Sequence, residues 1–114
     1  MKFGEWGEEI AAKYLKKKGY QIIEKNFRSK VGEIDIIAEK NNIICFIEVK
    51  TRHSEKYGCP AESITQYKKR HITRTAEYYL LLKKYEDRDA RIDVIEILIN
   101  DGNTTINHIE DAIN

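Results

Sequence analysis

The chain has 114 residues, of which 41% are hydrophobic and 34% are charged, with a single proline. These values are typical of a soluble globular protein and exclude a long disordered chain, so residues 1–114 are expected to form one domain. The formal net charge is +1, which neither requires nor excludes a polyanionic partner, because local clusters of charge decide that question.

The amino-terminal stretch MKFGEWGEEI contains acids where an export signal needs an apolar block, and no apolar run is long enough to span a membrane. The sequence therefore predicts a cytoplasmic protein with no membrane partner. Cys45 and Cys59 have no CxxC spacing. Two reduced thiols are favoured over a disulfide or a zinc site.

Hydrophobic periodicity and turn residues predict two helices and five strands in the order αβββαββ. In chain order these are a helix over 3–18, strands over 20–27, 33–40 and 43–52, a helix to about residue 85, and strands over 91–99 and 104–109. Ser63 or Thr65 can cap the second helix. Asp101 and Gly102 are expected to form the turn between the last two strands. The predicted fold is of the α/β class, a mixed sheet flanked by helices.

The strands over 33–40 and 43–52 are expected to form a hairpin, because Asn41 and Asn42 between them tolerate the positive φ of a two-residue turn. Lys40 then faces Ile43, and the antiparallel register pairs Asp35 with Glu48 and Glu33 with Lys50. The opposite face of the same hairpin is apolar throughout, with pairs of the type Ile36–Ile47.

Two carboxylates in this register lie about 4.5–5.5 Å apart and repel each other unless a cation lies between them. Asp35 and Glu48 offer the oxygen ligands that Mg²⁺ prefers, and Lys50 shares their face close enough to reach a phosphate oxygen. The alternative is a half-exposed sheet with surface ion pairs of little energetic value. That alternative accounts for Glu33 and Lys50 but leaves the two opposed acids as an uncompensated cost.

Several segments, in this order along the chain, resemble the YraN-like family of small bacterial proteins: GEEIAAKYL, GEIDIIA, FIEVKTR, YGCPAESIT and RIDVIEI. Asp35 followed by Glu48-Val49-Lys50 also resembles the D…(D/E)xK core of the restriction-endonuclease-like nuclease superfamily. The resemblance implies a restriction-endonuclease-like fold with a four-stranded mixed sheet core, similar to that of archaeal Holliday-junction resolvases. Glu8 resembles the amino-terminal helical glutamate of those resolvases, and the helical wheel also turns Glu8, not Glu9, toward the apolar arc.

These features together predict a nuclease that depends on Mg²⁺ or Mn²⁺ and hydrolyses phosphodiester bonds in nucleic acid, with DNA as the expected substrate. Asp35 and Glu48 would hold the metal, Glu8 would assist through the metal or its water, Lys50 would stabilise charge on the phosphate, and Glu33 would position Lys50. Phosphate contacts are expected from five basic side chains: Lys16, Arg52, Lys68, Arg70 and Arg74.

Two alternatives remain open for this sequence. One is a binding module of the same fold that recruits nucleic acid or a protein without turnover, and the other is a structural subunit of a larger assembly. The basic clusters alone do not decide, because each is also compatible with a solvated helix face. The resemblance to junction resolvases further implies paired sites, and hence a twofold homodimer.

Overall fold

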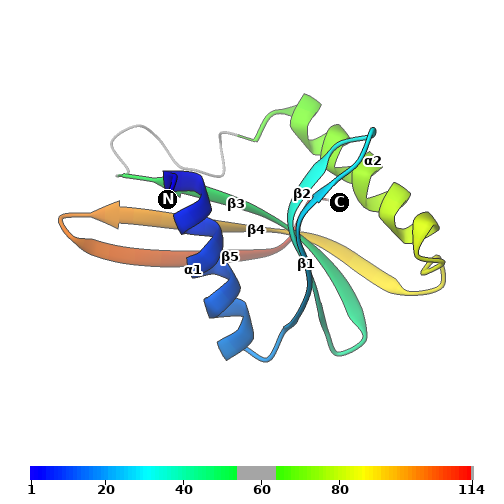
Figure 1. The fold of residues 1–114 in the computed structure, drawn as a ribbon, viewed down its shortest axis with the longest axis horizontal. Helices are drawn as coiled ribbons and strands as arrows, with labels where there is room; N and C mark the ends of the chain where they lie inside the picture. The colour runs from blue at the N-terminus through cyan, green and yellow to red at the C-terminus, as the bar shows by residue number, and fades with distance from the viewer. Residues whose placement is uncertain (54–63, 114) are drawn as a thin grey trace.

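The computed structural model describes residues 1–53 and 64–113. The elements in chain order are α1 (Phe3–Lys17), β1 (Gln21–Arg28), β2 (Glu33–Lys40), β3 (Ile43–Arg52), α2 (Gln66–Leu82), β4 (Asp89–Asn100) and β5 (Asn103–Ile113). This is the predicted order αβββαββ, and the class is α/β (Figure 1). No helix in the described ranges is both long and apolar enough to cross a membrane.

The five strands form one mixed sheet in the order β1-β2-β3-β4-β5. Strands β3 and β4 run parallel, as a connection through a helix requires, and the other neighbours are antiparallel. Strand β5 pairs with β4 from Asn103 to Ile113, four residues further than the sequence predicted, and adds a fifth strand to the four-stranded core implied by the resemblance.

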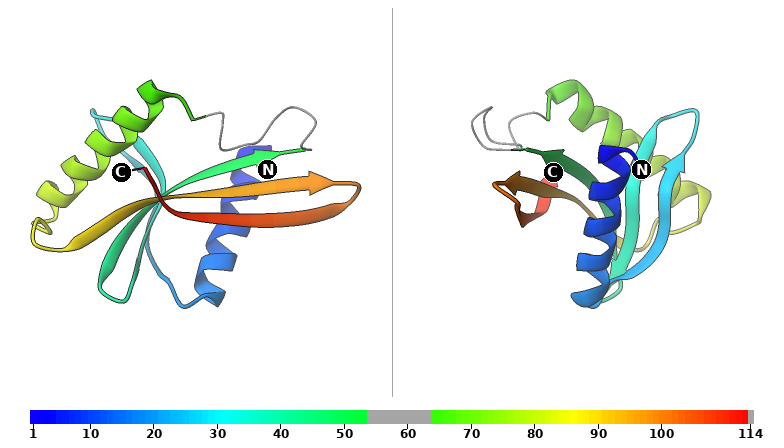
Figure 2. Two further views of the ribbon diagram at one scale, coloured as in Figure 1. Left: turned by 180° about the vertical axis from the view of Figure 1, so that it is seen from behind. Right: turned by 60° about the vertical axis from the view of Figure 1, so that its left-hand side comes forward.

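The two helices cover opposite faces of the sheet, as the views from the two sides show (Figures 1 and 2). On one face α1 packs through Ala11, Ala12 and Leu15 on apolar residues of β2, β3 and β4. On the other face α2 packs through Ile72, Ala76 and Tyr79 on a second cluster. These buried positions recur at the spacing of one face of a helix.

The two turns predicted from the sequence are confirmed. Asn41 and Asn42 have φ values of 51° and 66°, and Lys40 faces Ile43 across the β2–β3 turn. Asp101 and Gly102 likewise have positive φ and join β4 to β5. The boundaries of the β2–β3 hairpin are those predicted from the alternation of apolar and polar residues.

Helix α2 begins at a cap formed by Thr65, whose Oγ1 accepts a hydrogen bond from Lys68 N at 3.1 Å. It ends at Leu82, earlier than predicted, because Lys84 adopts a left-handed φ of 59° and Tyr85 N donates back to Leu80 O. The alternative cap Ser63, Cys59 and most of the YGCPAESIT segment lie outside the described residues.

Candidate functional site

The carboxyl groups of Asp35 and Glu48 lie together on the α2 face of the sheet, where β2 and β3 begin to separate. Val49 N donates a hydrogen bond to Asp35 Oδ2 at 2.8 Å, which holds the Asp35 side chain against β3. Asp35 also shares a hydrogen bond with the Glu48 carboxyl group, and this contact requires one proton between the two acids. The side chain of Glu48 is only 12% exposed.

This pair of acids is electrostatically unbalanced. Burial, the hydrogen bond with Glu48 and the charge of Glu48 raise the pKa of Asp35 to about 8, while the hydrogen bond from Val49 N opposes the rise. At neutral pH the pair therefore retains a proton. A bound cation would replace that proton and favour both ionised carboxylates.

Two lysines complete the site. Lys68 Nζ of α2 lies 3.4 Å from Glu48 Oε2. Burial and the neighbouring Lys68 ammonium lower the pKa of Lys50, although Glu48 and Asp35 oppose this. Burial would also lower the pKa of Lys68, but its contacts with Lys50 and with Glu48 outweigh burial and raise it. Lys68 therefore holds its proton more firmly than Lys50 does.

Glu33 does not take the position predicted for it. The backbone pairing of β2 with β3 ends at Ile36 and Ile47, and beyond that point β2 continues with β1 while β3 continues with β4. Lys50 consequently faces Glu96 of β4. Glu33 instead faces Arg28 of β1 and forms an exposed ion pair with it at 3.8 Å. The predicted Glu33–Lys50 pair is wrong, because the register was extended past the point where the two strands diverge.

Glu8 lies on α1 within electrostatic range of the acid pair. Burial raises its pKa, a hydrogen bond with Asn26 opposes the rise, and Glu48 adds to it. In residues 1–53 and 64–113, however, no three His, Cys, Asp or Glu side chains are arranged closely enough to hold a metal ion together. Asp35 and Glu48 offer two carboxylates, and an ion such as Mg²⁺ commonly takes one or two carboxylates and keeps several waters.

A cavity of about 430 Å³ gives access to the acid pair. Its walls come from the β1–β2 turn, from β2 and β3, and from α2: Ser29, Gly32, Glu33, Asp35, Glu48, Lys68, His71 and Ile72. The turn can approach α2 because Gly32 has no side chain; a Cβ there would lie 2.6 Å from His71 Nε2. The cavity is large enough for a phosphate group and part of a nucleotide.

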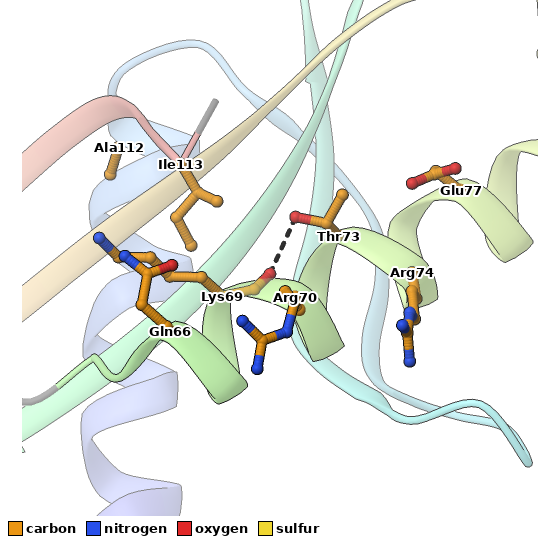
Figure 3. A pocket seen from close by; sticks show the side chains of 8 residues that line it. All are labelled: Gln66, Lys69, Arg70, Thr73, Arg74, Glu77, Ala112 and Ile113. Carbon is orange, nitrogen blue, oxygen red and sulfur yellow. Dashed lines mark hydrogen bonds between the residues drawn. The ribbon is translucent and has the colours of Figure 1, made fainter.

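The predicted phosphate contacts fall in different places. Arg70 and Arg74 line a second groove of about 400 Å³ between α2 and the end of β5 (Figure 3). Arg52 is half-buried at the end of β3, on the strand that carries Glu48 and Lys50. Lys16 is exposed in the last turn of α1, on the helix that covers the other face of the sheet. Lys68, also predicted to bind phosphate, contacts Glu48.

Another acid, Asp93, was not singled out from the sequence. It is fully buried and accepts hydrogen bonds from Arg91, from His108 Nε2 at 2.8 Å and from Asp111 N at 2.9 Å. Tyr14 of α1 contacts the other ring nitrogen of His108. An acid in the middle of the apolar strand RIDVIEI was the available signal, because a buried carboxylate requires partners.

Comparison with known proteins places this chain among sequences of very similar length. The model of the family described as "Uncharacterised protein family UPF0102" matches residues 7–97. A UPF0102 protein of Caldicellulosiruptor saccharolyticus is 49% identical over 111 residues, covering 96% of this chain and 94% of that protein. A UPF0102 protein of Syntrophomonas wolfei is 45% identical over 109 residues, covering 96% of this chain and 95% of that protein. The chain belongs to the UPF0102 family, also known as the YraN family.

Proposed function

We propose that the protein is a nuclease that depends on Mg²⁺ or Mn²⁺ and hydrolyses phosphodiester bonds in DNA. The observation that carries this proposal is the acid pair of Asp35 and Glu48, both partly buried and lining an open polar cavity, with Lys50 on the same strand face as Glu48. A carboxyl pKa raised to about 8 by burial and by a neighbouring acid is costly for stability and is typical of functional sites.

In the proposed reaction, the oxygen of a water molecule bonds to phosphorus and one P–O ester bond breaks. One proton of that water ends on the leaving alkoxide and the other is released to solvent. Asp35 and Glu48 would hold the metal, and Glu8, which interacts electrostatically with both acids, would assist through the metal or its water. When bound, the metal lowers the pKa of water and neutralises charge on the phosphate.

Lys50 would orient the attacking water and stabilise the negative charge that develops on the phosphate. Its position suits this role because it lies two residues beyond Glu48 on the same strand face. A lysine side chain with a lowered pKa also exchanges a proton more readily near neutral pH than an ordinary lysine. Glu33, exposed and paired with Arg28, is left without a part in this mechanism.

One observation favours a second candidate, a nucleic-acid-binding module without turnover. A cation of the chain itself, Lys68, already lies 3.4 Å from Glu48. If that ion pair persists when ligand binds, Lys68 replaces the metal and the site can bind a phosphate without activating water. The two candidates differ in whether a divalent ion displaces Lys68 from Glu48.

The deciding experiment measures cleavage of a panel of labelled DNA and RNA substrates, single-stranded, duplex and branched, with Mg²⁺ or Mn²⁺. Lys50→Met should lower the cleavage rate about a hundredfold or more, which is the usual loss when one transition-state donor is removed. Glu9→Gln is the matched control, because Glu9 is exposed on the outer side of α1. It should cut at the wild-type rate.

Metal binding and folding are measured on the same proteins. If Lys50→Met folds and binds Mn²⁺ but does not cut, Lys50 has a catalytic role. If Lys50→Met cuts as fast as the wild type, the catalytic role is rejected. A wild type that binds DNA but cuts no member of the panel with either metal supports the binding module instead.

A further inference from the structure

Helix α2 carries an exposed aromatic ring beside the cavity that holds the acid pair. Tyr67, in the first turn of the helix, is 70% exposed. One face of its ring stacks on the imidazole of His71, with the ring centroids 5.8 Å apart and the planes 15° from parallel. His71 is a wall of the cavity and lies against the β1–β2 turn at Gly32. Tyr67 is therefore a solvent-exposed ring supported from one side by a packed residue.

Tyr67 also separates two polar hollows. At 100° per residue, it lies about 40° around the helix axis from His71 and about 60° in the other direction from Arg70. His71 belongs to the cavity with Asp35 and Glu48, whereas Arg70 belongs to the second groove. The ring thus stands on the ridge of α2 between the two.

The second groove is lined by the kind of side chains that bind a phosphate backbone. Three of the side chains that line it are basic, Lys69, Arg70 and Arg74, and Glu77 is the one acid among its lining residues (Figure 3). Thr73 between them donates its hydroxyl to Lys69 O at 2.8 Å. No acid lies in the first turn of α2, so the start of the helix adds no repulsion toward a phosphate.

We infer that Tyr67 is a stacking platform for an unpaired base, and that the nucleic acid bound at this site is single-stranded where it crosses α2. Proteins that bind single strands combine a basic groove for the backbone with exposed aromatic rings for the bases. A base in a duplex is already stacked on its neighbours and cannot lie on Tyr67. This inference rests on the proposed function for the class of ligand, but it does not require that the protein cleaves it.

The test measures binding in EDTA, where no cleavage can interfere. Three ligands of equal length are compared by fluorescence anisotropy: a labelled DNA single strand, the same strand with abasic sites replacing its central bases, and a duplex. Tyr67→Ala should weaken binding of the single strand about 5- to 150-fold, which corresponds to the usual contribution of stacking one base. It should leave the abasic strand and the duplex bound as tightly as by the wild type. Tyr67→Trp should retain binding of the single strand.

Tyr78→Ala is the matched control. Tyr78 is a second exposed tyrosine on α2, 39% exposed, about 16 Å further along the helix axis and away from the cavity. It should bind all three ligands as the wild type does. The inference is overturned if Tyr67→Ala binds the single strand like the wild type, if it loses the abasic strand equally, or if the wild type does not bind single strands. If the wild type and its variants bind as expected here but the wild type cuts no substrate with metal present, the nuclease proposal alone is rejected.

Discussion

Two acids, the fully buried Asp93 and the partly buried Asp35, lie on opposite faces of the same sheet and have opposite environments. Asp93 is on the α1 face, where burial alone would raise its pKa. Hydrogen bonds from His108, from Asp111 N and from Arg91 outweigh burial and hold the pKa below its ordinary value. Every oxygen of this carboxylate has a donor within the chain.

Asp35 on the α2 face accepts a hydrogen bond from Val49 N and has a second acid, Glu48, as a side-chain partner. Its raised pKa shows that the folded chain leaves the ionised pair incompletely neutralised. The comparison distinguishes a carboxylate that stabilises the fold from one whose neutralisation is left to a proton or a ligand. A site of the second kind gains the most from a bound cation.

The largest effect is expected at Asp93 and its hydrogen-bond donors, which we call the balanced centre. Asp93→Asn should lower the free energy of unfolding by about 3–5 kcal/mol, because it leaves the guanidinium of Arg91 without its buried partner. Glu110→Gln removes the exposed member of the same network, which is 60% exposed, and should cost about 1 kcal/mol or less. Urea denaturation of both variants measures the difference. Equal losses in the two would show that Asp93 is not the anchor of the network.

The acid pair of Asp35 and Glu48, which we call the unbalanced centre, should make the stability of the protein depend on a divalent metal. Mn²⁺ at about a hundred times its Kd should stabilise the wild type by about 2.7 kcal/mol, because the ion binds only the folded site. Asp35→Asn should lose most of this gain, whereas Glu9→Gln, an exposed acid of α1, should retain it. Melting temperatures with and without Mn²⁺ are the measurement. An equal rise in all three proteins would place the ion elsewhere.

The two centres should also differ in how stability depends on pH. The pKa of Asp35 rises from an ordinary 3.8 to about 8 on folding, so between these values the folded protein binds more protons than the unfolded chain. Stability in EDTA should therefore fall as pH rises through this window, with a slope of up to about 1.4 kcal/mol per pH unit from this proton.

Asp35→Asn should remove that contribution, so its unfolding free energy should depend less on pH from 5 to 8 than that of the wild type. Asp93 has the opposite sign: its lowered pKa stabilises the fold above pH 3.8, and this contribution is lost only as pH falls further. Urea titrations across the pH range test both statements. Parallel curves for the wild type and Asp35→Asn would contradict the raised pKa.

The difference between the centres also explains what the sequence could predict. The acid pair follows from local information, because the Asn41–Asn42 turn and the alternation of β2 and β3 fix which side chains share a face. The Glu33–Lys50 pair failed where the strands diverge, since twist and the competition of β1 and β4 for pairing are not local properties.

The Asp93 centre depends on tertiary contacts that no local sequence pattern predicts. His108 reaches Asp93 only because β5 folds back along β4 and shifts register near Ile92, and Tyr14 comes from the opposite end of the chain. The groove at Arg70 and Arg74 likewise needs the end of β5 as its second wall. A helical pattern predicts which face of α2 carries the basic residues, but it does not predict which part of the fold lies beside that face.

The smallest effect is expected at Lys68, the lysine of α2 that pairs with Glu48. In the free protein it is the ion-pair partner of Glu48, and in the complex we expect it to turn to a phosphate as metal takes its place. Lys68→Ala should then make the dependence of DNA affinity on salt shallower by about 0.7–0.9 on logarithmic axes, the contribution of one phosphate contact.

The control is Lys13→Ala, which changes an exposed lysine of α1 and should leave the slope unchanged. The slope is obtained from titrations in Mg²⁺ with Lys50→Met as the background of both variants, because that substitution is expected to leave metal binding intact while preventing cleavage. The titrations are repeated without Lys50→Met in EDTA, where no metal competes with Lys68. If Lys68→Ala has the same slope as the matching protein with Lys68 in both conditions, Lys68 stays with Glu48 when DNA binds. Its role is then to balance the charge of that acid within the chain, as Arg91 does for Asp93.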